Sequence, residues 1–111
     1  LSYVMDEKTS FRLVFGDGPV VKIIDFLIDN QEFDYSLTDI AKGAEIAWST
    51  LHECWPELVA LKIVKKTRRI GRAELYKLDA ENRLVKKLLD LDLFISTEFV
   101  QKELGKIELA A

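Results

Sequence analysis

The sequence is poor in the residues on which disulfides, metal centres and many catalytic sites depend. Its 111 residues include one cysteine, one histidine, two prolines and five glycines. The single cysteine, Cys54, excludes an internal disulfide and any metal site built on several cysteines. His52 lies two residues away on a predicted helix, so the two side chains point to different faces and cannot share a metal ion. No Ser/His/Asp or Cys/His catalytic pattern surrounds the one histidine, and we expect a protein that is not an enzyme and has no cofactor.

Long apolar runs are also missing. No stretch reaches the roughly 18 residues that a membrane-spanning helix needs, and no basic leader followed by an apolar segment marks a signal peptide. Hydrophobic residues make up 49% of the chain and charged residues 32%, which is typical of a globular protein and not of a disordered one. At this length a single domain is expected. One thiol and no membrane segment favour a cytoplasmic protein.

The formal net charge of −3 argues against a polyanionic partner, but the charges are unevenly distributed. Residues 1–60 carry a net charge of −7, residues 61–77 a net charge of +6 and residues 78–111 a net charge of −2. Nearly half of all lysines and arginines therefore lie in one short segment. A phosphate backbone would respond to this local patch and not to the mean charge. The alternative is a charged hairpin that is merely solvated.

Apolar spacing predicts an amphipathic helix after an ambiguous start. Residues 1–15 suit either a strand or a short leading helix. Pro19 suits the first turn of a helix, with Asp17 or Gly18 as its cap. Apolar residues then recur at helical spacing to about Asn30.

Two further helices joined by a tight turn are expected after a short connection. Ser36 and Asp39 form a weak capping box that opens a helix of about two turns. Residues 43–45 are expected to form the tight turn, and a third helix then covers residues 46–61. Pro56 lacks an amide hydrogen, so we expect this third helix to kink or reset there. Two short helices joined in this way make a helix-turn-helix.

A β-hairpin is expected to carry the basic block. Residues 63–70 are rich in β-branched and long basic side chains, and residues 73–78 alternate in polarity. Gly71 and Arg72 between them are a turn signal. Tyr35, earlier in the chain, can form a strand of one or two residues.

The last segment is predicted to be helical. Asp79 or Asn82 can cap this helix at its start. Its continuity past Ser96 is open, because Ser96 and Thr97 can instead cap a separate final helix.

This last helix is apolar over more than one face, which favours a homodimer. One apolar stripe is spaced like the seam of a coiled coil. We expect it to form the dimer contact, through Leu84, Leu88, Leu91, Ile95 and Phe99. Asp90 and Asp92 resemble a carboxylate pair, but they lie on different helix faces and are expected to be solvated.

The order of these elements is that of a winged helix-turn-helix domain. The expected fold class is mainly α with a small β-hairpin wing, an α+β arrangement that ends in a C-terminal dimerisation helix. Within a single domain we expect an N-terminal extension over 1–17, a winged core over 18–78 and the C-terminal helix or helices over 79–111.

Two stretches resemble the DNA-binding motifs of ArsR/MarR-type transcription regulators. Residues 36–41 (SLTDIA) and 46–51 (IAWSTL) resemble the helix-turn-helix pattern S-x-x-E-I-A … V-S-R-S-T-V. Residues 64–78 (VKKTRRIGRAELYKL) look like the wing pattern V-x-x-T-R-x-x-G-R-x-x-x-Y-x-L. The resemblance covers about residues 18–90, and it is strongest to the small winged-helix regulators common in archaea.

The resemblance implies a regulator that binds double-stranded DNA, usually as a homodimer. It implies DNA contacts from the recognition helix and from the wing, by Trp48, Ser49, Thr50, His52, Lys65, Lys66, Arg68, Arg69 and Arg72. A helix N-terminus and its hydroxyls can bind phosphate, and an inserted helix can reach base edges in the major groove. Wing arginines can bind phosphates or enter an A·T-rich minor groove. The sequence identifies neither an operator nor a small-molecule effector.

The recognition helix departs from the family pattern in ways that favour a second hypothesis. Glu45 stands at the usual turn glycine, Ala47 at the usual N-cap serine, and Trp48 and Glu53 at usual arginines. From residue 44 to residue 61 there is no lysine or arginine. Carboxylates repel phosphates, although a glutamate can accept a hydrogen bond from a cytosine amino group. The rival hypothesis is a winged-helix module that binds a protein through Trp48 and the acidic helix.

Overall fold

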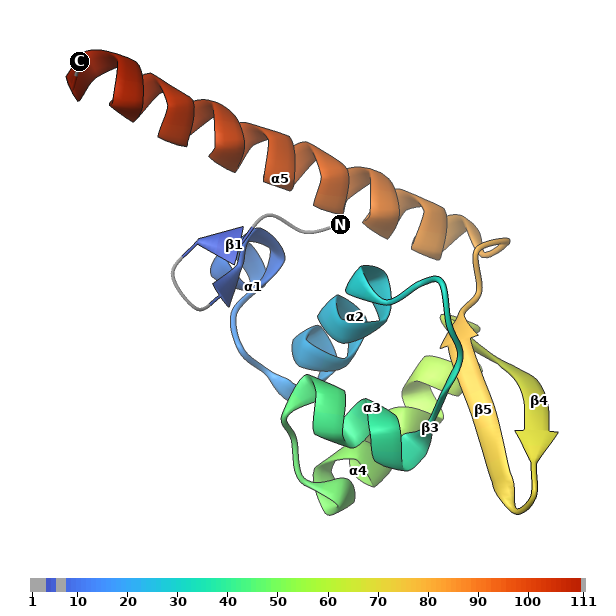
Figure 1. Ribbon diagram of the computed structural model, residues 1–111. Helices are drawn as coiled ribbons and strands as arrows, with labels where there is room; N and C mark the ends of the chain where they lie inside the picture. Colours follow the sequence, from blue (N-terminus) through green and yellow to red (C-terminus); the bar gives the residue numbers. More distant parts are fainter. Residues whose placement is uncertain (1–3, 6–7, 111) are drawn as a thin grey trace.

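The computed structural model describes residues 4–5 and 8–110 of the chain. It has five helices and five strands among these residues (Figure 1). In chain order they are β1 (Val4–Met5), β2 (Lys8–Thr9), α1 (Ser10–Phe15), α2 (Pro19–Asp29), β3 (Tyr35–Ser36), α3 (Leu37–Ala44), α4 (Trp48–Ala60), β4 (Val64–Ile70), β5 (Ala73–Leu78) and α5 (Arg83–Ala110). The predicted fold class is confirmed: the chain is mainly helical, with a three-stranded antiparallel sheet and a long C-terminal helix.

Helix α2 begins and ends close to its predicted limits. Pro19 occupies the first turn and Gly18 is the N-cap, which suits a residue that has no amide hydrogen to donate. The apolar face of α2 packs against α3 and α4, and its Ile23 and Leu27 are almost fully buried together with Ile40. This apolar contact between the three helices is the centre of the core.

Helix α3 has the predicted length of about two turns, but it ends later than expected, so the tight turn expected at residues 43–45 is wrong in its placement. The helix continues through Gly43 to Ala44, and Glu45 ends it in the left-handed conformation with φ 57°. The N–H of Ile46 then bonds to the carbonyl of Ala41 at 3.0 Å. Gly43 stays helical because α3 crosses α2 closely there: a Cβ atom at this position would lie 2.1 Å from the ring of Phe26.

Helix α4 contains Pro56 without being interrupted. The helix is continuous from Trp48 to Ala60, so the expected reset does not occur. Leu51, Trp55 and Leu58 bury one face of α4 on both sides of the proline. This packing offsets the hydrogen bond that proline cannot donate to the carbonyl of His52.

The sheet has the strand order β3-β5-β4. The predicted hairpin of β4 and β5 is confirmed, with Gly71 in its turn at φ 61°. The short strand predicted at Tyr35 is also present, and it pairs with Tyr76 of β5. The register of β4 shifts between Lys66 and Arg68, which marks a β-bulge at Thr67.

Helix α5 is one continuous element, so a separate final helix starting at Ser96 is not formed. Asn82 caps it as predicted, since its Oδ1 accepts hydrogen bonds from the N–H groups of Leu84 and Val85. Ser96 is buried, and its hydroxyl lies 3.2 Å from that of Ser10 in α1. Figure 1 shows α5 passing over α1 and α2, with its C-terminal end extending past the rest of the fold.

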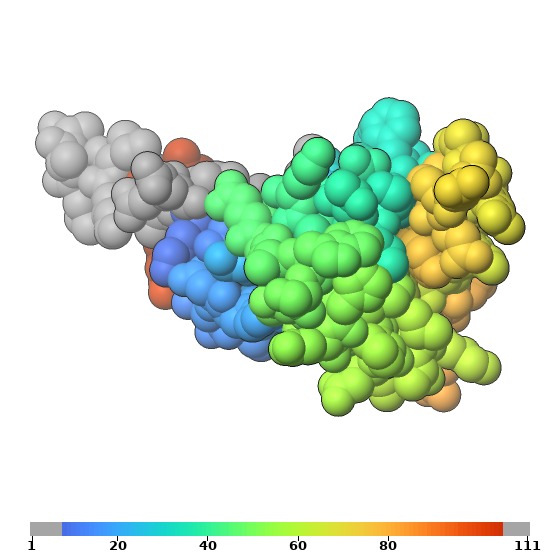
Figure 2. Space-filling view, turned by 90° about the horizontal axis from the view of Figure 1, so that it is seen from below, coloured from blue at the N-terminus to red at the C-terminus, as the bar shows by residue number. Residues whose placement is uncertain are grey.

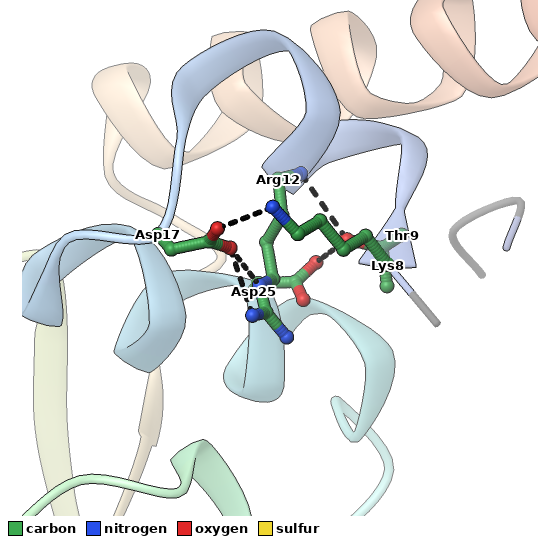
Figure 3. Close-up of polar contacts among 5 residues, drawn as sticks. All are labelled: Lys8, Thr9, Arg12, Asp17 and Asp25. Atoms are coloured by element: carbon green, nitrogen blue, oxygen red, sulfur yellow. Dashed lines mark hydrogen bonds and ion pairs between the residues drawn. The ribbon is translucent and has the colours of Figure 1, made fainter. Parts of the chain in front are cut away.

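The ambiguous N-terminal segment forms a short hairpin and a helix. Strands β1 and β2 pair, and α1 follows and packs against α5. Residues 1–3 and 6–7 of this segment lie outside the described residues. Lys8 and Arg12 both bond to the carboxylate of Asp17, as Figure 3 shows, and this lowers the pKa of Asp17, with the Lys8 hydrogen bond contributing most.

Asp92 lies in the interior, which corrects the expectation that both Asp90 and Asp92 are solvated. Asp90 is exposed, but Asp92 has an exposed fraction of only 3%. Asp92 shares its helix face with Val85 and Ser96, and this face is turned toward the core. Identifying that face requires knowing which side of α5 packs on the body.

Asp25 of α2 is the second buried carboxylate, and it lies close enough to Asp92 to interact electrostatically. It has an exposed fraction of 6%, and the Thr9 hydroxyl donates to its Oδ1 at 2.9 Å (Figure 3). The pKa of Asp25 is raised to about 6, mainly by burial; the Thr9 hydrogen bond and Arg12 oppose this shift, and the negative charges of Asp29 and Asp92 add to it. Burial therefore favours the neutral carboxyl form.

Replacing Asp25 with asparagine should stabilise the protein above pH 6. The folded state holds the Asp25 proton more tightly than the unfolded chain does. The free energy of unfolding should therefore fall as pH rises from about 4 through about 6, by about 2–3 kcal/mol. Urea unfolding between pH 4 and pH 8 measures this, and D25N should lack the decline. The exposed control D90N should follow the wild type, and an unchanged decline in D25N would contradict this account.

Candidate nucleic-acid interface

The wing, residues 64–78, holds the predicted basic side chains on an exposed strand. Lys65, Lys66, Arg68 and Arg69 lie on β4, an edge strand whose one pairing strand in the described part of the chain is β5. Arg72 lies in the turn at the tip. All five are exposed, so the structure brings the predicted wing residues together on one hairpin.

These cations differ in how far they are already paired within the protein. Arg68 forms an ion pair with Asp34 at 3.0 Å, and the Nε of Arg69 donates to the carbonyl of Gly71 at 3.0 Å. Among the residues that the structure describes, the side chains of Lys65 and Arg72 make no hydrogen bond or ion pair. Lys65 and Arg72 are therefore the wing cations most available to an external anion.

Glu74 is the one acidic residue on the wing, and its charge is largely compensated. Lys66 Nζ lies 3.4 Å from its Oε1, and the Tyr76 hydroxyl donates to its Oε2 at 3.0 Å. The Tyr76 hydrogen bond and then Lys66 lower the pKa of Glu74. Burial and then the Glu74 contact raise the pKa of Tyr76. Glu74 is thus an ionised carboxylate that already has a cation and a donor.

Trp48 lies at the start of α4 with half of its surface exposed. Its exposed fraction is 50%, and its ring contacts that of His52 edge-to-face at a centroid distance of 4.2 Å. His52 and Ser49 are exposed and Thr50 is partly buried. The N-terminal turns of α4 therefore present an aromatic pair and hydroxyl groups to solvent, and Trp48 is not part of the core.

A groove of about 310 Å³ joins Trp48 to the wing. It lies between the start of α3, the start of α4 and the beginning of β5, and it is lined by Ser36, Leu37, Thr38, Trp48, Arg72, Ala73, Glu74 and Tyr76. Figure 2 shows the face on which the region around α3 and α4 adjoins the wing. The groove brings predicted residues from two separate elements, Trp48 and Arg72, into one site.

Sequence reasoning missed the part of the groove contributed by α3 and β5. Thr38 and Tyr76 reach it because β3 pairs with β5, with Tyr35 opposite Tyr76. This pairing places the N-terminus of α3 beside the wing. The sequence predicts the strand at Tyr35 but assigns it no partner, and its need for a pairing strand in the predicted hairpin was the signal that could have located these residues.

The exposed side of α4 is acidic, as the sequence indicates. Glu53 and Glu57 are exposed on it, and Glu45 is exposed in the preceding turn. The site therefore has a cationic half on the wing and an anionic half along α4. An approaching polyanion would be attracted to the first and repelled by the second.

Neither a metal-ligand cluster nor a membrane-spanning helix is found in the described part of the chain. Among residues 8–105, no group of three or more His, Cys, Asp or Glu side chains is arranged to hold a metal ion. None of the described helices is both long enough and apolar enough to cross a membrane.

Comparison with known proteins gives a structural likeness without a sequence match. No protein-family model matches the chain, and no curated protein matches it. The zinc-responsive MarR family member ZitR of Lactococcus lactis, solved in complex with DNA, aligns with a TM-score of 0.54 at 15% identity, over 96% of this chain and 66% of that chain.

Two further regulators align in the same way. MepR, a transcription regulator of the Staphylococcus aureus multidrug efflux pump MepA, gives a TM-score of 0.59 at 19% identity over 76% of this chain and 60% of its own. The adhesin competence repressor AdcR of Streptococcus pyogenes gives a TM-score of 0.58 at 16% identity, over 78% of this chain and 64% of its own. The chain thus spans about 60% of the length of several of the regulators that it matches.

The chain has the winged helix-turn-helix fold of MarR-family regulators, which confirms the predicted resemblance at the level of structure. These structural neighbours are transcription regulators and not enzymes. They come from bacteria, and the stronger resemblance to archaeal members stays a prediction.

Replacing Glu45 with glycine should stabilise the helix-turn-helix. Glu45 adopts φ 57°, a conformation that costs a non-glycine residue about 1 kcal/mol and costs glycine little. We expect the free energy of unfolding to rise by about 0.5–1 kcal/mol, measured by urea unfolding. The control K42G, at an exposed position inside α3, should instead lose about 1 kcal/mol. A loss of stability in E45G would show that Glu45 makes contacts that outweigh the strain.

Proposed function

We propose that this protein is a transcription regulator that binds duplex DNA with the wing and the start of α4. The observation that carries the proposal is the groove, because it places the unpaired cation Arg72 beside the half-exposed Trp48. In this arrangement α4 lies in the major groove, and the wing follows the backbone or enters the next minor groove. The sugar–phosphate backbone of one DNA strand then crosses the protein groove that lies between α4 and the wing.

The lining of the groove suits a sugar–phosphate backbone. Ser36 and Thr38 provide hydroxyl groups, Arg72 provides a positive charge, and Trp48 provides an apolar wall for a deoxyribose. Hydroxyls, arginines and backbone N–H groups are the usual protein partners of DNA phosphates. Because Lys66 and Tyr76 already hold Glu74, this carboxylate adds less repulsion than an isolated one would.

The α4 helix contributes contacts of a different kind. Ser49 and Thr50 can bond to phosphate, and His52 can reach a base edge. Glu53 and Glu57 lie further along the helix and oppose close approach of the phosphates there. We therefore propose that the wing supplies most of the affinity and that α4 supplies the sequence reading.

We further propose a homodimer formed through α5, with residues 18–78 as the DNA-binding part. Leu84 and Leu91 of the predicted dimer contact are exposed, by 46% and 39%. Ile95 is buried, Leu88 is partly buried against the chain's own core, and Phe99 is partly buried. The apolar area available to a partner therefore includes further exposed residues that the predicted stripe omits, namely Leu93, Phe94, Val100 and Leu104.

A winged-helix module that binds another protein is the second candidate. The observation that favours it is the acidic α4 surface with an exposed tryptophan at one end. Such a module would need no affinity for a polyanion. The dependence of duplex binding on salt separates the two candidates.

Duplex binding should depend steeply on salt. If a dimer contacts roughly four to eight phosphates, log K should fall with log salt with a slope of about −4 to −7. Fluorescence anisotropy of a labelled duplex over a range of salt concentrations measures this slope. R72A should weaken binding to all sequences and reduce the slope by about 0.9 per protomer. The control R83A, at the start of α5, should keep the wild-type slope, and absence of binding at low salt would reject the DNA proposal.

A charge substitution at Leu91 tests the proposed dimer. L91D places a charge on an exposed position of the proposed interface, so the chain's own core stays intact while association is lost. Sedimentation at micromolar concentration should give a dimer for the wild type and a monomer for L91D. K87D, at an exposed lysine of the same helix, should remain dimeric. A monomeric wild type would contradict the proposal.

A further inference from the structure

We propose that Arg68 is a positioning residue, which fixes the wing by holding Asp34, and that it does not itself bind DNA. This inference rests on the proposed DNA-binding function, and it reverses the role that the family resemblance implies for Arg68. It concerns the contact between the connection after α2 and the edge strand of the sheet.

The contact between Arg68 and Asp34 occupies one of the two edges with which a guanidinium can bind an oxyanion, the edge formed by Nε and Nη2. Nε of Arg68 donates to Oδ2 of Asp34 at 3.0 Å, and Nη2 donates to Oδ1 at 3.1 Å. This two-bond geometry is the arrangement that an arginine would also use for a phosphate. Arg68 therefore cannot present the same edge to DNA while the contact persists.

The neighbouring Thr67 reinforces the contact. Its hydroxyl donates to Oδ2 of Asp34 and lies 3.2 Å from the carbonyl oxygen of Leu75. Adjacent residues of a regular strand point to opposite faces, so Thr67 and Arg68 would not normally share a partner. The β-bulge at Thr67 breaks this alternation and lets both side chains reach one carboxylate.

The position of the contact in the sheet gives it a mechanical effect. Among the described strands, β4 pairs with β5 alone, while Asp34 directly precedes β3 on the other side of β5. The Arg68–Asp34 contact therefore spans β5 and gives the edge strand a second attachment to the body. Without it, the exposed part of β4, which follows the buried Val64, would be held mainly by its pairing with β5.

The charges at this contact are also balanced. Asp34 has a side chain that is only 14% exposed, and hydrogen bonds from Arg68 and then Thr67 lower the pKa of Asp34 to about 2. Its carboxylate is therefore ionised at neutral pH and neutralises Arg68 locally. The positive charge of Arg72, by contrast, is not neutralised by any partner among the described residues.

The substitution D34N tests the proposal, because the two roles of Arg68 predict opposite effects on duplex binding. If Arg68 were a DNA ligand, D34N would free it and remove a negative charge, so duplex binding would strengthen. If Arg68 positions the wing, D34N should weaken binding by about fivefold, the upper range for an exposed ion pair. Anisotropy with a labelled duplex at low salt measures the sign. Tighter binding by D34N would overturn the proposal.

The salt dependence and a double variant provide the second readout. R68A should weaken binding about as much as D34N while leaving the slope of log K against log salt unchanged, whereas R72A lowers that slope. The double variant D34N/R68A should be no weaker than either single variant, since one contact is lost in each. A slope reduced in R68A as in R72A would overturn the proposal.

The control D39N removes another exposed carboxylate, in the first turn of α3. It should leave duplex binding unchanged or tighten it, which separates loss of the Arg68 contact from loss of negative charge. Binding of the wild-type chain tests the proposed function on its own. The sign of the D34N effect, measured against that binding, tests the role of Arg68.

Discussion

The edge-to-face contact between Trp55 and Tyr76 joins the recognition helix to the wing, and the candidate site depends on it. The ring centroids are 5.2 Å apart and the planes are inclined by 79°. Trp55 is buried, and among the described residues its Nε1–H has no hydrogen-bond partner, a cost of about 1–3 kcal/mol. This unpaired N–H lies where α4 packs against β5. Tyr76 in turn donates to Glu74, which holds Lys66, so packing in the core also orders charges on the surface.

The uneven charge of the chain acquires a geometric meaning in this fold. Glu45, Glu53 and Glu57 are exposed along the helix-turn-helix, and the basic segment is displayed on the β4–β5 hairpin beside it. A duplex would be attracted at the wing and repelled along the far part of α4, which favours one orientation of docking. Not every wing cation contributes to this attraction, because Arg68 and Lys66 are paired with carboxylates inside the protein.

Residue preferences over a few positions predicted where most helices and strands lie. The features that were not predicted depend on packing between segments far apart in the sequence. The helix from Pro19, the hairpin around Gly71 and the cap at Asn82 follow from residue preferences within a few positions. The burial of Asp92 follows from the side of α5 that meets the body, which no local pattern specifies. The partner of Arg68 is 34 residues away in sequence, and the groove exists only because β3 pairs with β5. The basic residues could therefore be predicted as a group, but their separate roles could not.

Backbone amide hydrogen exchange of the whole chain, with and without a DNA duplex at low salt, tests the central claim most directly. The account predicts slower exchange on binding at the three edges of the groove, in residues 36–38, 48–52 and 69–73. The exposed acidic side of α4 around Glu57 should be unaffected. Protection confined to the acidic part of α4, or no change on addition of DNA, would contradict the claim that the groove and the wing form a DNA-binding surface.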